Sequence, residues 1–130
     1  MLKAGITGTE IFTVTKNRTA NSIGSGTLDV LATPVLAAFM EKCAWQSVAD
    51  ELEEGQTTVG NGLELVHSSP TPVEMKVRCE SELRRIDGKS LLFIITAYDE
   101  AGEIARAKHE RCIVNIDTFL AKTAIKQTGR

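Results

Sequence analysis

Three side chains in this sequence, Thr33, Glu41 and His67, have the residue types needed for attack on a carbonyl group. A threonine hydroxyl is a weak nucleophile until a neighbouring base takes its proton, and histidine changes its charge close to neutral pH. A carboxylate can orient such a histidine and stabilise its charged form. The trio therefore predicts a hydroxyl that attacks or positions a water, a general base, and an acid that orients the base.

Each of the three residues also has an ordinary structural explanation. Thr33 precedes Pro34 at the expected start of a helix, as an N-cap does. Glu41 is followed by Lys42, so a local ion pair or a solvent-facing helix surface would account for it. His67 stands at the expected end of a strand, where its ring can be satisfied without any chemistry. Taken singly, each residue favours the structural explanation.

The spacing of Thr33, Glu41 and His67 favours a chemical explanation over the structural ones. The N-terminus of a helix presents free N–H groups and partial positive charge, which suits the oxyanion formed when a carbonyl is attacked. Thr33 and Glu41 are separated by roughly 12 Å along a helix, too far for a direct hydrogen bond. An imidazole from the same or a second protomer can bridge that gap. We therefore expect Glu41 to orient His67, and His67 to activate Thr33 or a water.

A long helix must position the first two of these residues. We expect it to begin with Thr33 as N-cap and Pro34 at the first helical position, and to end at Gly55. Apolar residues recur at helical spacing, so the first turns are predicted to be buried nearly all round. These residues are Val35, Leu36, Phe39, Met40, Cys43, Ala44, Val48 and Leu52.

The rest of the chain is predicted to form strands. Alternating or continuous apolar residues indicate each strand, and Asp87-Gly88 is typical of a tight hairpin turn. The small polar segment from Asn21 to Thr27 is expected to be a loop, and Asp117 to Ala124 a short helical turn. The expected strands are Thr9 to Lys16, Thr57 to His67, Val73 to Glu80, Leu91 to Ile95 and Ile104 to Ile116.

This β-α-β-β-β-β order predicts an α+β protein with a hotdog fold. One long apolar helix and an antiparallel meander both bury their apolar surfaces when the curved sheet wraps around the helix. We expect residues 1–130 to form one such domain. A single unit leaves sheet edges exposed, and symmetric association covers them. A homodimer, or a dimer of dimers, is therefore expected.

The composition is that of an ordinary globular protein. Of the 130 residues, 42% are hydrophobic and 25% are charged, and the formal net charge is -2, so nucleic acid is not an expected partner. The three cysteines show no metal-binding or disulfide spacing. The sequence shows no leader and no membrane-spanning stretch, so we expect a cytoplasmic protein. Because the cysteines lack metal-binding spacing, we expect no bound metal.

Several short segments, in their order and spacing, resemble one family. From about Leu28 to Phe119 the chain is similar to the fluoroacetyl-CoA thioesterase-like hotdog proteins. The segments are Ala32-Thr33-Pro34, Met40-Glu41, Thr58-Val59-Gly60, His67 followed by Thr71-Pro72, Asp87-Gly88-Lys89 and His109-Glu110-Arg111.

The resemblance implies a role for five residues. Thr33, Glu41 and His67 would form the catalytic set. Gly60 would offer backbone contact to the acyl group or the thioester, and Arg111 would support the site. One segment departs from the family: the founding fluoroacetyl-specific member carries aromatic lid residues just ahead of its Ala-Thr motif, whereas residues 24–27 here read Gly-Ser-Gly-Thr. We therefore expect no preference for a fluoroacetyl group.

The leading hypothesis is hydrolysis of an acyl-CoA thioester with a short or small acyl group. No cofactor is expected beyond the CoA of the substrate. A hotdog hydratase or dehydratase is an alternative, but it would leave Thr33 with only a capping role. A non-catalytic acyl-CoA-binding or sensing domain is a second alternative. No output module accompanies the domain in this sequence, which makes the sensor less favoured.

Overall fold

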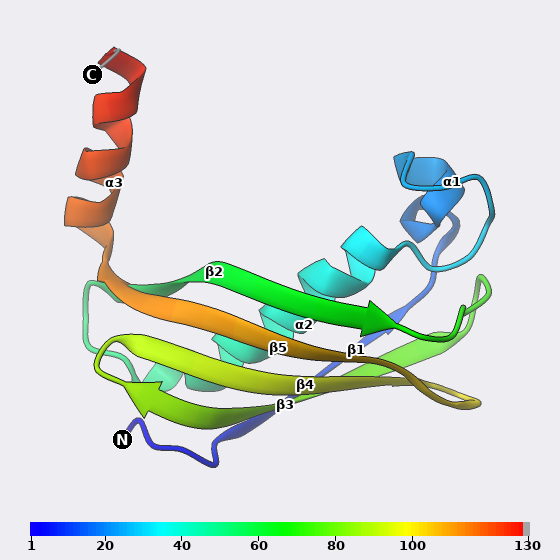
Figure 1. The fold of residues 1–130 in the computed structure, drawn as a ribbon, viewed down its shortest axis with the longest axis horizontal. Helices are drawn as coiled ribbons and strands as arrows, with labels where there is room; N and C mark the ends of the chain where they lie inside the picture. The colour runs from blue at the N-terminus through cyan, green and yellow to red at the C-terminus, as the bar shows by residue number, and fades with distance from the viewer. Residues whose placement is uncertain (129–130) are drawn as a thin grey trace.

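A computed structural model describes residues 1–128 of the chain. One antiparallel sheet of five strands, in the order β1-β3-β4-β5-β2, curves around a long helix, α2 (Figure 1). The elements are β1 (Thr7–Thr13), α1 (Ala20–Ile23), α2 (Thr33–Val48), β2 (Gln56–His67), β3 (Lys76–Asp87), β4 (Ser90–Asp99), β5 (Gly102–Asn115) and α3 (Ile116–Ile125), with short 3₁₀ turns at Lys16–Arg18, Ala49–Glu51 and Lys126–Thr128.

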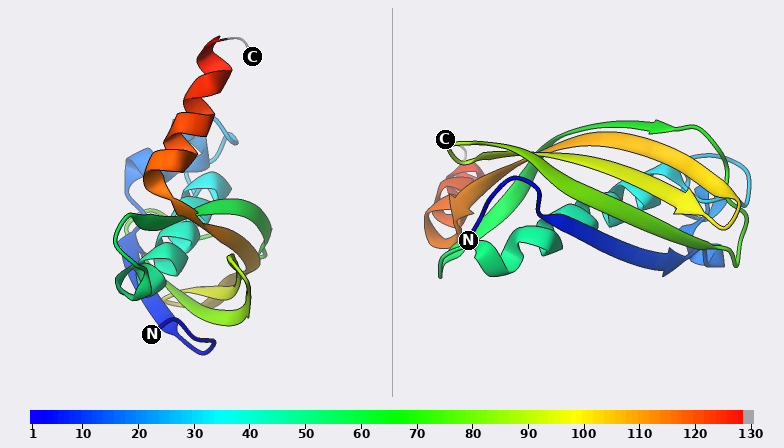
Figure 2. Two further views of the ribbon diagram at one scale, coloured as in Figure 1. Left: turned by 90° about the vertical axis from the view of Figure 1, so that its left-hand side faces the viewer. Right: turned by 90° about the horizontal axis from the view of Figure 1, so that it is seen from below.

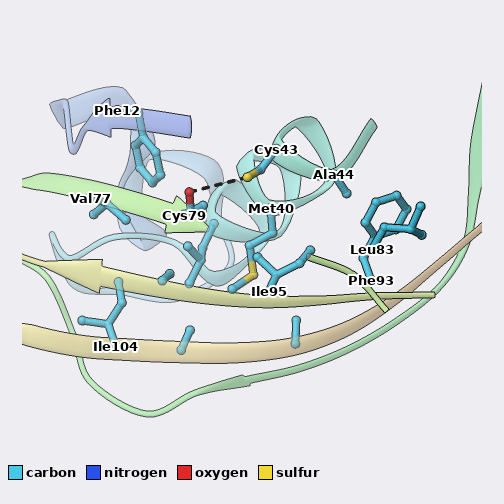
Figure 3. Close-up of a cluster of buried hydrophobic side chains, with 14 of the residues drawn as sticks. Phe12, Met40, Cys43, Ala44, Val77, Cys79, Leu83, Phe93, Ile95 and Ile104 are labelled. Atoms are coloured by element: carbon cyan, nitrogen blue, oxygen red, sulfur yellow. Dashed lines mark hydrogen bonds between the residues drawn. The ribbon is translucent and has the colours of Figure 1, made fainter. Parts of the chain in front are cut away.

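Helix α2 lies against the concave face of this sheet, as Figure 2 shows from below. Its buried side chains meet the inward-facing residues of the strands in one hydrophobic core (Figure 3). The hotdog architecture expected from the sequence is confirmed. The helix contributes Leu36, Met40, Cys43, Ala44 and Val48, and the sheet contributes, among others, Val77, Leu83, Phe93, Ile95 and Ile104.

The expected end of α2 at Gly55 is wrong. The α-helix stops at Val48 and continues only as the 3₁₀ turn Ala49–Glu51. Val48 is the last buried residue of the helix, and the acids that follow would oppose the negative end of the helix dipole. Gly55 instead has φ of 85°, a conformation favourable for glycine, and forms the turn into β2.

The expected start of the third strand at Val73 is also wrong, because β3 begins at Lys76. Glu74 has φ of 78°, which interrupts the extended backbone that the alternating pattern predicts. Two backbone hydrogen bonds stabilise this interruption: the Glu74 N–H donates to the Val14 carbonyl, and the Val14 N–H donates to the Met75 carbonyl. Alternation alone does not reveal such a turn.

The two segments expected to be a loop and a short turn are more regular than predicted. Residues 20–23 form the single turn α1, which overlaps the start of the segment expected to be a loop. The C-terminal turn is the ten-residue helix α3, capped by the Asn115 side chain and projecting from one end of the sheet (Figures 1 and 2). Within residues 1–128, no helix is long and apolar enough to span a membrane.

Candidate active site

The first turn of α2 places Thr33 beside His67, the last residue of β2. The Thr33 Oγ1 atom lies 2.7 Å from His67 Nδ1. The expectation that Thr33 is the N-cap is wrong: Ala32 is the N-cap, and Thr33 is the first helical residue. Its hydroxyl makes no capping hydrogen bond and is free to donate to the imidazole.

The histidine of this pair has the properties of a general base. A hydroxyl that donates to Nδ1 requires a neutral ring with its proton on Nε2. His67 Nε2 is buried and has no hydrogen-bond partner within residues 1–128. Burial lowers the pKa of His67 below its ordinary value, and the backbone of Ser69 partly opposes that shift. The ring is therefore neutral, and able to accept a proton, at neutral pH.

A surface hollow of about 540 Å³ opens beside this pair. Thr33 and His67 line it together with parts of α1, the segment after α1, and the residues that follow β2. The positive end of the α2 dipole points to the same place, where an oxyanion would be stabilised. The lining residues are Ala20, Ser25, Val30, Leu31, Thr33, Pro34, His67, Ser68, Ser69 and Pro70.

Glu41 lies two turns further along α2 and has a different partner from the one expected. Its Oε2 atom is 3.3 Å from Arg111 Nη1 and 3.6 Å from His109 Nε2. Lys42, the neighbour that could have paired with it, binds Glu10 instead. No hydrogen bond or ion pair joins Glu41 to His67 within residues 1–128 of one chain. The structure thus brings Thr33 to His67, and Glu41 to Arg111.

Arg111 is buried and firmly anchored. Its Nε donates to Thr58 Oγ1 at 2.8 Å, and its Nη2 donates to the Thr58 carbonyl at 3.0 Å. Burial lowers the pKa of Arg111, and the Glu41 carboxylate opposes this shift. Arginine keeps its charge in proteins even when its pKa is lowered. The guanidinium is therefore a fixed positive charge beside Glu41.

Gly60 lies against this ion pair. It is opposite Arg111 in the β2–β5 register, at the edge of a β-bulge that shifts the register between Gly60 and Gly62. A Cβ atom at residue 60 would collide with Glu41 Oε2 and would come within 3.1 Å of Arg111 Nη1. A residue with a Cβ atom here would force the carboxylate to move.

His109 was not singled out from the sequence except as part of a motif. It is 1% exposed, and its imidazole lies between Arg111 and the Gly62 carbonyl. The period-two pattern of β5 contained a usable signal: Ala105, Ala107, His109 and Arg111 share the inward face. Two polar side chains on an inward face of a strand indicate a site.

The lowered pKa of His67 leads to a prediction. The neutral form is favoured on folding, so this contribution to the free energy of unfolding is present above pH 6.5 and is lost as the pH falls through the lower, folded value. We expect the ring signals of His67, followed by NMR and assigned with His67→Ala, to titrate with a midpoint below 6.5. A midpoint at or above 6.5 would contradict the buried neutral base.

Comparison with known proteins identifies the family. The family model described as fluoroacetyl-CoA-specific thioesterase matches residues 14–117. The fluoroacetyl-CoA thioesterase of Streptantibioticus cattleyicolor is 31% identical over 98 residues, which cover 75% of this chain and 70% of that protein.

Two solved structures extend the likeness to the whole fold. A threonine-to-serine variant of the fluoroacetyl-CoA thioesterase FlK, in complex with acetyl-CoA, has a TM-score of 0.89 at 26% identity and covers 96% of this chain and 98% of that one. A thioesterase superfamily member from Thermus thermophilus has a TM-score of 0.91 at 22% identity over 98% of this chain and 95% of its own. The chain belongs to the fluoroacetyl-CoA-specific thioesterase family of hotdog-fold proteins.

Proposed function

We propose that this protein is an acyl-CoA thioesterase that releases a short or small acyl group as the free acid. The hydrogen bond of 2.7 Å between Thr33 and His67, beside an open hollow, is the observation that supports this most directly. The family assignment gives the substrate class, because the named relatives act on or bind acyl-CoA thioesters. A hydratase would leave this contact without a use.

In the proposed reaction, His67 Nδ1 takes a proton as the thioester carbonyl is attacked. The attacking oxygen is either Thr33 Oγ1 or a water that Thr33 positions. The resulting oxyanion is stabilised at the N-terminus of α2, and its collapse breaks the carbon–sulfur bond. The CoA thiolate leaves with the proton held by the imidazolium. If the oxygen came from Thr33, a water activated by His67 then hydrolyses the acyl-threonine ester.

Glu41 is proposed to act at the other end of the site. Within one chain its carboxylate faces Arg111 and Gly60, so its predicted contact with His67 is not made there. It is half-exposed, with 43% of its side chain accessible, and is therefore able to meet substrate or a second protomer. We retain Glu41, Gly60 and Arg111 as the part of the site that holds the substrate near His67.

The hollow favours a broad acyl preference rather than a fluoroacetyl one. Its lining contains no aromatic residue apart from the imidazole of His67, and Ser25 is the one residue of segment 24–27 that contributes to it. Among residues 1–128 of one chain, no aromatic lid therefore lines the hollow beside the Thr33 hydroxyl. Two expectations stay predictions: that no separate cofactor takes part, and that the protein is cytoplasmic.

A variant series tests the function. We expect wild-type protein to release CoA thiol from short acyl-CoAs, and Thr33→Ala and His67→Ala to lower kcat by about 100-fold or more. Because Thr33 is not a cap, Thr33→Ala should change the free energy of unfolding by less than about 0.5 kcal/mol. Thr123→Ala, in the exposed helix α3, is the matched control.

Two outcomes would contradict the proposal. Full activity in His67→Ala would exclude the mechanism. Binding of many acyl-CoAs by the wild-type protein without any turnover would favour the sensing alternative.

The space beside Gly60 gives a second test. We expect Gly60→Ala to lower kcat/KM by about 10-fold to 100-fold, because the new methyl group displaces the Glu41 carboxylate. Gly62→Ala is the matched control in the same bulge: its Cβ would lie 3.2 Å from Glu110 Oε1, the free end of a surface side chain. Steady-state kinetics should show a larger loss of kcat/KM in Gly60→Ala than in Gly62→Ala. Equal losses of kcat/KM would show that the substitutions disturb the bulge rather than the carboxylate.

We further propose that two chains associate along β2. This strand is an edge of the sheet, and its Val66 side chain is 68% exposed. Pairing of two such edges would satisfy their open backbone groups and bury apolar surface beside the site. Light scattering after size exclusion should give twice the chain mass of 14.1 kDa, or four times for a dimer of dimers. A mass of one chain in fully active protein would contradict the association.

A further inference from the structure

His109 makes two hydrogen bonds that fix the state of its ring. Nδ1 lies 2.8 Å from the Gly62 carbonyl oxygen, which can only accept a hydrogen bond. Nε2 lies 3.0 Å from Arg111 Nη1, which can only donate. The ring therefore carries its proton on Nδ1, and its Nε2 lone pair faces the guanidinium.

The surroundings keep this ring neutral. Burial lowers the pKa of His109, the Gly62 carbonyl opposes that shift, Arg111 adds to it, and Glu41 opposes it. The charged groups that face the ring are Arg111 of β5 and Glu41 of α2. The Phe93 ring of β4 covers another side, with centroids 6.3 Å apart. A second ring proton would point at a guanidinium, so His109 serves as a permanent acceptor rather than as a proton carrier.

Together with Thr58, this acceptor fixes the orientation of the planar guanidinium and so the directions of its hydrogens. Thr58 accepts one hydrogen bond from Nε and one from Nη2. Nη1 carries two hydrogens, and its two neighbours are His109 Nε2 at 3.0 Å and Glu41 Oε2 at 3.3 Å. With one hydrogen held by the imidazole, the other is directed to the carboxylate at Gly60. The Glu41 position thus depends on His109 through Arg111.

We propose that His109 is a positioning residue for thioester hydrolysis, which holds the Arg111 guanidinium so that the Glu41 carboxylate stays at the opening made by Gly60. This inference rests on the proposed function. A role as core filler alone is disfavoured, because a polar ring is costlier to bury than an apolar side chain and here both of its nitrogens are used.

Two amide substitutions separate the two hydrogen bonds. A glutamine oxygen can stand near the place of Nε2 and accept from Arg111, whereas an asparagine amide can stand only near the place of Nδ1 and donate to Gly62. We expect His109→Asn to lower kcat/KM by about 10-fold to 100-fold and His109→Gln to restore at least a third of the wild-type value. Lys108→Gln, on the exposed face of the same strand, is the matched control.

A readout without substrate separates this inference from the proposed function. The Arg111 Nε–H resonance, assigned with Arg111→Lys, should remain distinct and slowly exchanging in wild type and His109→Gln, and should broaden or shift in His109→Asn. Absence of thiol release from wild type would refute the function yet leave this signal as predicted. Wild-type kinetics and an unchanged Arg111 signal in a folded His109→Asn protein would overturn the inference. If His109→Asn does not fold, His109→Leu, which removes both hydrogen bonds, replaces it in both measurements with the same expected results.

Discussion

The position of α2 inside the curved sheet is the constraint on which every polar contact of the site depends. Its buried side chains pack mainly against β1 and β3, with further contacts to β2 and β4, so the helix cannot slide along the sheet without opening voids. This packing holds Thr33 at the end of β2 and Glu41 two turns further on, beside Gly60. The chemistry is therefore positioned by apolar contacts remote from it.

Helix α2 takes part in two electrostatic environments, one shared with β2 and the other shared with β2 and β5. At the His67 end, burial with no charged partner among residues 1–128 favours a neutral imidazole, as a general base requires. At the Glu41 end, the buried Arg111 is satisfied by Thr58 and His109 and presents a fixed positive charge to a half-exposed carboxylate. The first environment suits proton transfer, and the second suits orientation of a polar substrate.

The sequence predicted the architecture well because the fold follows from periodicity: one buried helix and alternating strands have few joint solutions. It also predicted that Thr33 and His67 interact, which the 2.7 Å contact between them agrees with, while their catalytic roles stay predictions. It did not predict that Glu41 binds Arg111 rather than His67, because that pairing depends on the β2–β5 register and on the bulge after Gly60. Neither leaves a periodic signal. The mistaken N-cap arose because Thr-Pro at a helix start fits both the cap and the first helical position.

A double-mutant cycle on kcat/KM shows whether Thr33 and His67 act as one unit. Thr33→Ala, His67→Ala and the double variant would be compared in single-turnover thiol release with a short acyl-CoA. We expect the double variant to be no slower than the slower single variant, because either change removes the same proton transfer. Losses that multiply, so that the two effects are independent, would contradict it.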